Sequence, residues 1–268
     1  MQLTDTHTHL FASEFDADRV EMMHRAIEKG VTRFFLPNID ADSIQPMLAL
    51  CDAFHDKCFP MMGLHPCSVT ADYEAQLAVI KEWLSNDKFY AVGEIGIDLY
   101  HDTTYAEQQK LAFRKQIEWA KEAELPIVIH TRNSFNEVME IVTDMKDERL
   151  KGIFHCFSGT IEDAKHIIEL GDFKMGIGGA VTYKNSTLPK VLEQIPLEYL
   201  VLETDSPYLT PVPHRGKRNE SAYIYYVADK LSDIYQISVE KIADITTANS
   251  IKGIRSVIIN LFSCRCYN

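Results

Sequence analysis

Eight short apolar segments alternate with helix-like stretches along the 268 residues of the chain. This alternation predicts a single-domain α/β fold, a closed parallel (β/α)8 TIM barrel. The spacing agrees: His9 and Asp205 lie 196 positions apart, about 28 for each of seven strand-to-strand steps, against roughly 31 in a barrel of about 250 residues. The alternative is an open doubly wound sheet, which usually carries a glycine-rich nucleotide loop after its first strand. Here THTHL follows that strand instead.

The expected strands are short apolar runs, each followed by polar or glycine residues. In chain order they are Leu3–Thr6, Arg33–Leu36, Phe59–Gly63, Tyr90–Gly93, Ile127–Ile129, Gly152–Phe154, Phe173–Gly176 and Leu200–Glu203. Residues 107–124 give a clear helical pattern between two of them. The apolar positions of that helix, at +4 and +3 spacing, are Phe113, Ile117 and Ala120. Thr160, with Asp163 three residues later, predicts a capped helix N-terminus.

Composition narrows the class of protein. Hydrophobic residues make up 46% and charged residues 25%, and no apolar run reaches the roughly 20 residues that cross a bilayer. No basic-then-apolar secretory signal is visible, and the six cysteines are scattered, so we expect reduced thiols, a cytoplasmic location and no membrane partner. The net charge of −12 argues against a protein that coats nucleic acid by bulk attraction. It does not argue against an enzyme that binds one or two phosphates locally.

Polar side chains gather where the predicted strands end, and in a barrel those ends meet at one mouth. Those that could ligate a metal are His7, His9, Glu94, His130, His155 and Asp205. Each alone has an ordinary explanation, since a lone histidine after an apolar run is more often a hydrogen-bonded core residue. Glu94 between glycines is also typical of a turn, and Asp205 of a helix cap. Their common position on different strands favours a metal centre over six separate coincidences.

Six ligands are too many for one tetrahedral ion and suit two ions that share a bridge. A carboxylate has two oxygens, so Glu94 is the expected bridge. The first ion would take His7, His9, Glu94 and Asp205, and the second Glu94, His130 and His155. Two divalent cations about 4 Å apart can clamp the attacking and leaving oxygens of a displacement at phosphorus. Imidazole ligands favour Zn²⁺ or Mn²⁺, whereas the carboxylates also allow Mg²⁺.

Further residues are expected to act on the substrate. Asp205, at the edge of the metal site, can accept the proton of an activated water, which makes Asp205 and Glu94 the expected catalytic residues. Arg132 follows His130 by two positions, and its planar guanidinium suits a pair of phosphate oxygens. His65 and Arg215, the latter in the basic stretch 214–218, could hold further phosphates. The alternative for that stretch is an ordinary solvated loop.

Seven motifs, in order, resemble the TatD family of metal-dependent deoxyribonucleases within the amidohydrolase superfamily. They are DTHTHL, GLHP, GEIGID, HTR, HCFSG, LETDSPYL and PHRGKRNE, within a resemblance that runs from Thr4 to about Asn249. The resemblance implies a (β/α)8 barrel, two divalent cations, and hydrolysis of DNA phosphodiester bonds from the 3′ end of single strands. It also implies the same two ligand sets, with His65 and Arg132 at positions associated with substrate phosphate.

The chain departs from the family pattern at two places. Ser221 stands where the family usually has proline after the RGKRNE segment. Residues 254–268 do not fit the family's final helix, so we expect a barrel over 1–253 and an atypical tail over 254–268. The tail ends with Cys264 and Cys266, which by themselves are a weak metal signal.

Two other functions remain open from the residues alone. The same metals could serve an amide or lactone hydrolase, because an activated water attacks carbonyl groups as well as phosphorus. Arg132 and the basic stretch favour phosphorus modestly. A silent protein with structural metal fits less well, because structural sites usually take four ligands from local loops. The sequence does not give the oligomeric state, and a monomer is assumed.

Overall fold

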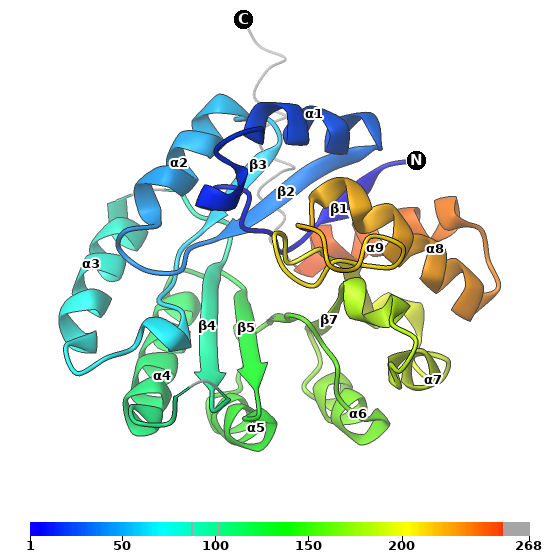
Figure 1. The fold of residues 1–268 in the computed structure, drawn as a ribbon. Helices are drawn as coiled ribbons and strands as arrows, with labels where there is room; N and C mark the ends of the chain where they lie inside the picture. The colour runs from blue at the N-terminus through cyan, green and yellow to red at the C-terminus, as the bar shows by residue number, and fades with distance from the viewer. Residues whose placement is uncertain (87, 101, 254–268) are drawn as a thin grey trace, which may run out of the picture.

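Eight parallel strands follow one another around a barrel in chain order (Figure 1). The computed structural model describes residues 1–253 except 87 and 101. The strands are β1 (Leu3–Asp5), β2 (Val31–Pro37), β3 (Cys58–Met61), β4 (Val92–Asp98), β5 (Ile127–Arg132), β6 (Gly152–Phe154), β7 (Phe173–Ile177) and β8 (Leu200–Leu202). Regular hydrogen-bonded ladders connect neighbouring strands in two runs, one from β1 through β2 to β3 and the other from β4 through β5, β6 and β7 to β8.

Backbone hydrogen bonds close the two remaining seams. Between β3 and β4, the Met62 N–H donates to the Ala91 carbonyl at 3.1 Å, and the Gly93 N–H donates to the Met62 carbonyl at 3.0 Å. Between β8 and β1, the Thr6 N–H donates to the Leu202 carbonyl, also at 3.0 Å. Because none of the eight strands in the described part of the chain is left as a free edge, the expected closed barrel is confirmed and the open sheet is excluded.

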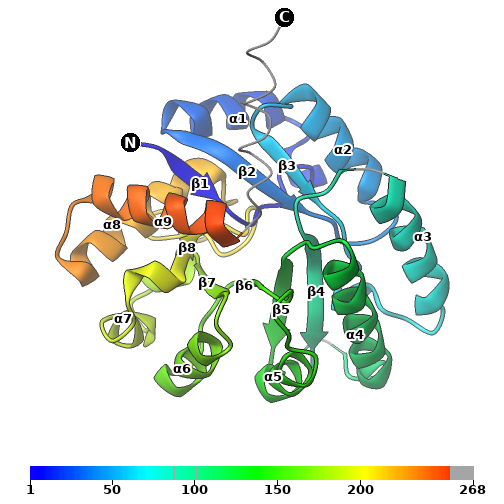
Figure 2. The same ribbon diagram turned by 180° about the vertical axis from the view of Figure 1, so that it is seen from behind.

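Helices surround the strands in both views (Figures 1 and 2). They are α1 (Arg19–Glu28), α2 (Ile44–Ala53), α3 (Tyr73–Asn86), α4 (Ala106–Glu122), α5 (Phe135–Asp144), α6 (Ile161–Glu169), α7 (Leu188–Leu192), α8 (Ile224–Tyr235) and α9 (Val239–Gly253). Within the described ranges, none of them combines the length and the apolar character of a bilayer-spanning helix.

The barrel interior is filled by a separate apolar cluster. Its buried members are Phe35, Phe59, Met61, Ala91, Val128, Ile153 and Val201. On β5, Ile127 and Ile129 instead pack in the larger core on the helix side, so inward and outward residues alternate along the strand. By the same alternation, His130, two residues after Val128, faces the barrel interior on the carboxyl-terminal side of this apolar cluster. Apolar side chains thus fill the barrel interior, and polar side chains face inward at the carboxyl ends of the strands.

The sequence-based elements are confirmed with one notable change of bounds. α4 matches the expected helix, with Phe113, Ile117 and Ala120 fully buried, and Thr160 and Asp163 form a reciprocal capping box. β4 differs, because it runs from Val92 to Asp98 and not over residues 90–93. Glycine and acidic residues are uncommon in strands, so the sequence pattern did not extend the strand over residues 94–98, where Ile95 and Ile97 are completely buried. Glu94 therefore lies within a strand. The expected tail, residues 254–268, lies outside the described residues.

Candidate metal centre

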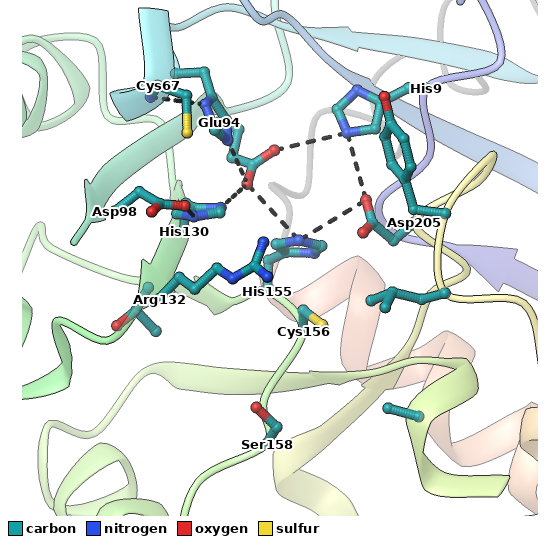
Figure 3. Close-up of a pocket in the computed structure, with 15 residues that line it drawn as sticks. His9, Cys67, Glu94, Asp98, His130, Arg132, His155, Cys156, Ser158 and Asp205 are labelled. Carbon is teal, nitrogen blue, oxygen red and sulfur yellow. Dashed lines mark hydrogen bonds and ion pairs between the residues drawn. The ribbon is translucent and has the colours of Figure 1, made fainter. Parts of the chain in front are cut away.

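A pocket of about 670 Å³ opens at the carboxyl end of the barrel (Figure 3). Its lining comes from strand ends and the loops that follow them: His9, His65, Cys67, Glu94, Asp98, His130, Thr131, Arg132, His155, Cys156, Ser158, Ala180, Asp205, Tyr208 and Leu209. Five of the six expected metal ligands are among them. The sixth, His7, is completely buried and contacts Glu94 and His155 from below the lining.

One ligand cluster surrounds the Oε2 atom of Glu94. His7 Nε2 lies 3.0 Å from that oxygen and 3.3 Å from His9 Nε2, and His9 Nε2 lies 3.7 Å from the same oxygen. Asp205 Oδ1 lies 3.8 Å from His7 Nε2 and 3.5 Å from His9 Nε2. Tetrahedral ligands at about 2.0–2.1 Å from a Zn²⁺ ion lie roughly 3.3–3.4 Å apart. The atoms of His7, His9 and Glu94 therefore form one cation-sized group, whereas Asp205 forms such a group with His7 and His155.

A second cluster surrounds the other oxygen of Glu94. His130 Nδ1 lies 2.7 Å from Oε1, His65 Nε2 3.4 Å and His155 Nε2 3.7 Å. Glu94 thus turns one carboxylate oxygen to each cluster, which is the geometry of a bridging ligand. The structure brings all six expected ligands into one site and adds His65, but it groups them as His7 with His9 and Glu94, His7 with His155 and Asp205, and His65 with Glu94 and His130. The expected division into two ligand sets therefore stays a prediction.

The carboxylates of the site are held in their ionised form. Burial alone would raise the pKa of Glu94, but His7, His65, His155 and His130 outweigh it and hold that pKa well below its usual range. Asp205 behaves alike: burial opposes ionisation, while His155, His9 and His7 lower its pKa. The donor set is therefore two ionised carboxylates and buried imidazoles, which fits divalent cations.

Neighbouring carboxylates raise the pKa of two histidines of the second set, His130 and His155. Burial disfavours the charged form of His130, yet hydrogen bonds with Asp98 and Glu94 raise its pKa to about 9. Burial is likewise outweighed at His155, where Glu203, Glu94 and Asp205 raise the pKa to about 10. Since an imidazole must lose its proton to ligate, cations and protons compete for these two rings.

Asp98 and Glu203 orient these rings, and sequence reasoning assigned no role to either. Asp98 Oδ2 lies 2.9 Å from His130 Nε2, the nitrogen that faces away from Glu94. Glu203 Oε1 lies 3.1 Å from His155 Nδ1 and accepts a 2.6 Å hydrogen bond from the Cys156 N–H. Carboxylates behind ligating histidines fix ring orientation and raise ligand basicity. Even spacing was the available signal, since Asp98 follows Glu94 by four strand positions and Glu203 precedes Asp205 by two.

Gly176 on β7 makes room for this supporting carboxylate. A Cβ atom at Gly176 would lie 1.9 Å from Glu203 Oε2 and 2.6 Å from the carboxylate carbon. Glu203 is only 1% exposed, so it has no open space into which to move. The glycine is therefore required for the position of the acid behind His155.

A buried carboxylate ties β1 to the loop after β8. Asp5 accepts hydrogen bonds from the Thr204 N–H at 2.9 Å, from Thr204 Oγ1 at 2.6 Å and from Ser221 Oγ at 2.6 Å. Burial raises the pKa of Asp5 to about 7. The network fixes the strand that presents His7 against the segment that presents Asp205. Ser221, the residue that departs from the family pattern, is one of its three donors.

Of the three expected phosphate-binding residues, His65 and Arg132 line the pocket and Arg215 does not. The Cys67 N–H donates to His65 Nδ1 at 3.0 Å, so in the neutral ring Nε2 carries the hydrogen and points toward the site as a donor. Arg132 lines the pocket, with its guanidinium 4.0 Å from the centre of the Tyr100 ring. Arg215 lies 3.8 Å from the Tyr183 ring and is absent from the pocket lining, so its phosphate role stays a prediction.

The fold and the two histidine–carboxylate clusters define a metal-dependent hydrolase built on a (β/α)8 barrel. The chain belongs to the TatD family, because the family model described as TatD related DNase matches residues 4–254. The resemblance inferred from the seven motifs is thereby confirmed.

Individual relatives agree with this membership. The chain is 39% identical to the uncharacterized metal-dependent hydrolase YabD of Bacillus subtilis, over 92% of this chain and 97% of that protein. It is 30% identical to the uncharacterized metal-dependent hydrolase YcfH of Escherichia coli, over 93% and 94%. The crystal structure of YjjV, a TatD homologue from Escherichia coli K12, superposes with a TM-score of 0.87 at 28% identity, covering 94% of this chain and 97% of that one.

Proposed function

We propose that the protein is a metal-dependent deoxyribonuclease that hydrolyses DNA phosphodiester bonds, from the 3′ end of single strands. One observation carries the proposal: Glu94 divides its two oxygens between two cation-sized clusters, and further polar donors lie beside them. Two cations sharing a bridge suit in-line displacement at phosphorus. His65 and Arg132 supply donors for the non-bridging phosphate oxygens, which a carbonyl substrate does not need.

The residues divide the work between holding cations and handling the substrate. His7, His9, Glu94 and Asp205 would hold one cation, and Glu94, His130 and His155 the other. Bound cations would supply Lewis-acid activation of a water and of the phosphate oxygens. Zn²⁺, Mn²⁺ and Mg²⁺ are the candidates, and the imidazole content favours the first two.

Asp205 is the proposed proton acceptor of the reaction. Its Oδ1 atom lies 3.5 Å from His9 Nε2 and 3.9 Å from His155 Nε2, so the carboxylate borders both clusters. It also lines the pocket and is 14% exposed, whereas Glu94 is 2% exposed. Asp205 can therefore meet an entering water. Arg132 and His65 would hold the phosphate in line while the water loses its proton to Asp205 and its oxygen bonds to phosphorus. The bond from phosphorus to the leaving sugar oxygen would break, and Asp205 would pass the proton to that oxygen.

The test uses purified protein stripped of metal and reconstituted with Mn²⁺, Mg²⁺ or Zn²⁺. We expect a 5′-labelled single-stranded oligonucleotide to shorten progressively, and shortening to stop in EDTA. Asp205→Asn should reduce the rate by at least about a hundredfold, because general acid–base groups contribute about 10²–10⁴. Glu118→Gln, an exposed acid on α4 paired with Lys115, is the matched control and should cleave normally.

The same preparation separates the alternative activity. A panel of amides and lactones is assayed beside the DNA. Intact DNA together with turnover of a lactone by the reconstituted enzyme would replace the deoxyribonuclease proposal with the carbonyl hydrolase. Loss of a 3′ label before a 5′ label establishes the direction of digestion.

A further inference from the structure

Strongly exposed aromatic side chains are few among the described residues. They are Tyr100, Tyr208 and Tyr225, with exposures of 58%, 53% and 37%. Two of the three belong to the mouth of the metal pocket: Tyr208 lines it, and Tyr100 carries Arg132, which lines it. A single exposed ring needs no explanation, but two exposed tyrosine rings beside one pocket point to a contact surface.

Tyr208 is held in place by its backbone. Its N–H donates to the Asp205 carbonyl at 2.8 Å, and its own carbonyl accepts a 2.6 Å hydrogen bond from Asn219 Nδ2. Asn219 is fully buried and also binds the Thr204 carbonyl at 2.8 Å. The ring stands at 64° to the His9 ring, with 6.3 Å between centroids. A ring fixed at its backbone beside the first ligand cluster offers a ready contact surface with little entropy to lose.

The pocket has a different character on its other side. Arg132, His130 and Asp98 lie together across the cluster from His9 and Asp205 (Figure 3). There the guanidinium of Arg132 lies over the Tyr100 ring, which places a cation where a phosphate would meet it.

Charge separates what the two sides can bind. The Tyr208 ring offers an uncharged aromatic face that suits a flat base, whereas the guanidinium of Arg132 suits an anionic phosphate. The Arg132 side takes phosphate. The pocket is thus divided into an aromatic side and a cationic side, with the metal ligands between them.

We propose that Tyr208 is a base-stacking platform: the base of the nucleotide next to the scissile phosphate lies on its ring, and the phosphates of the remaining strand follow the Arg132 side. This rests on the proposed function and specifies its substrate as a strand end with an unpaired base. Stacking on an aromatic ring tolerates every base, because each base has a π-face. A base inside a duplex has both faces covered by neighbouring pairs, so the platform favours an unpaired or frayed strand end.

The activity test compares Tyr208→Ala with Tyr208→Trp and with Tyr225→Ala. Tyr225 lies on α8, is exposed and lines no part of the pocket, so it is the matched control. We expect Tyr208→Ala to lower kcat/KM about tenfold on a single-stranded oligonucleotide. Tyr208→Trp and Tyr225→Ala should stay within about twofold of wild type. On an oligonucleotide whose terminal nucleotide is abasic, wild type should fall to the level of Tyr208→Ala, and the variant should lose nothing more.

A binding test works without cleavage. The Asp205→Asn protein is titrated against an oligonucleotide with 2-aminopurine at its 3′ end, whose fluorescence is quenched by stacking. We expect quenching that the additional Tyr208→Ala change abolishes and that Tyr225→Ala preserves. The platform would be overturned if Tyr208→Ala lowered kcat/KM equally on normal and abasic ends. It would also be overturned if 2-aminopurine quenching were unchanged when Tyr208 is replaced by alanine. Quenching by a protein that never cleaves DNA would retain the platform and refute the proposed nuclease; absence of both refutes both.

Discussion

At the scale of single residues, the site depends on a carboxylate with two separate faces. Glu94 Oε2 meets His7 and His9, while Oε1 meets His130, His65 and His155. Two of the side chains around it are oriented in turn, His130 by Asp98 and His155 by Glu203. Small displacements in this outer layer should therefore reach the ligands directly.

Gly176→Ala is the sharpest test of that dependence. The new Cβ would lie 1.9 Å from Glu203 Oε2, so the acid must move and His155 loses its orientation. We expect a 10- to 100-fold loss of metal affinity, measured by competition with a chromophoric chelator, as found for outer-layer partners in general. Gly178→Ala is the control, because its nearest contact with Glu203 would be an ordinary 3.7 Å. Equal affinity in the two variants would contradict the assigned role of Glu203.

At the scale of elements, the seam between β1 and β8 joins the two ends of the ligand set. The strands contribute backbone hydrogen bonds, and Asp5 adds three donors from the segment after β8. Ser221 is the one donor that the usual family proline, which has no hydroxyl, could not supply. Ser221 therefore gives Asp5 a hydrogen bond that a proline at this position could not supply.

Ser221→Ala should destabilise this seam. The buried Asp5 carboxylate loses one of its three short hydrogen bonds, and we expect the free energy of unfolding to fall by about 1–3 kcal/mol. Urea denaturation of the metal-free protein measures it. Ser85→Ala, which removes an exposed hydroxyl bonded to the Lys81 carbonyl on α3, should change stability by less than about 0.5 kcal/mol. A Ser221 variant as stable as wild type would show that water replaces the lost donor.

The elements themselves were predictable from local patterns, but their ends were less so. Alternating apolar runs located all eight strands, and the 3.6-residue period located α4 with its buried face. β4 was underestimated because glycine and acidic residues disfavour strands locally, while tertiary burial of Ile95 and Ile97 overrides that preference.

The ligand set was predictable for a topological reason, and its supporting layer was not. Parallel strands bring their carboxyl ends to one mouth, so polar residues at those ends had to converge. Even spacing places Asp98 and Glu203 on the same side as the ligands, but which histidine ring each one contacts depends on side-chain directions that spacing does not give. For Arg215, the basic stretch suggested a phosphate contact, but its guanidinium lies over the Tyr183 ring, a side-chain direction that the sequence does not give.

At the scale of the whole molecule, the ligands staple distant parts of the chain, so cations should stabilise the fold. A cation at 100 times its Kd adds about 2.7 kcal/mol, or roughly 5–10 °C in Tm for a chain of about this size. Differential scanning calorimetry with and without Zn²⁺ measures the shift, which EDTA should reverse. An unchanged Tm would mean that the clusters do not bind cations in the native state.

The size of this shift should depend on pH in a definite direction. The pKa values of His130 and His155 are raised to about 9 and 10 in the metal-free protein, so both rings are protonated at neutral pH. A cation must displace those protons, and its affinity therefore rises as pH increases toward that range. We expect a larger Tm gain at pH 8 than at pH 6 at equal free Zn²⁺. A gain that shrinks with rising pH would contradict the raised pKa values.

The bond between Thr204 and Asp5 spans 199 positions of the chain, which has a consequence during synthesis. A ribosome adding about 5–20 residues per second needs roughly 10–40 seconds between making the two partners. Throughout that interval the nascent polypeptide already carries the first pair of histidines but no aspartate to complete their set. A half-made copy therefore lacks part of the ligand set, and the complete metal centre can form only after Asp205 has been added to the chain.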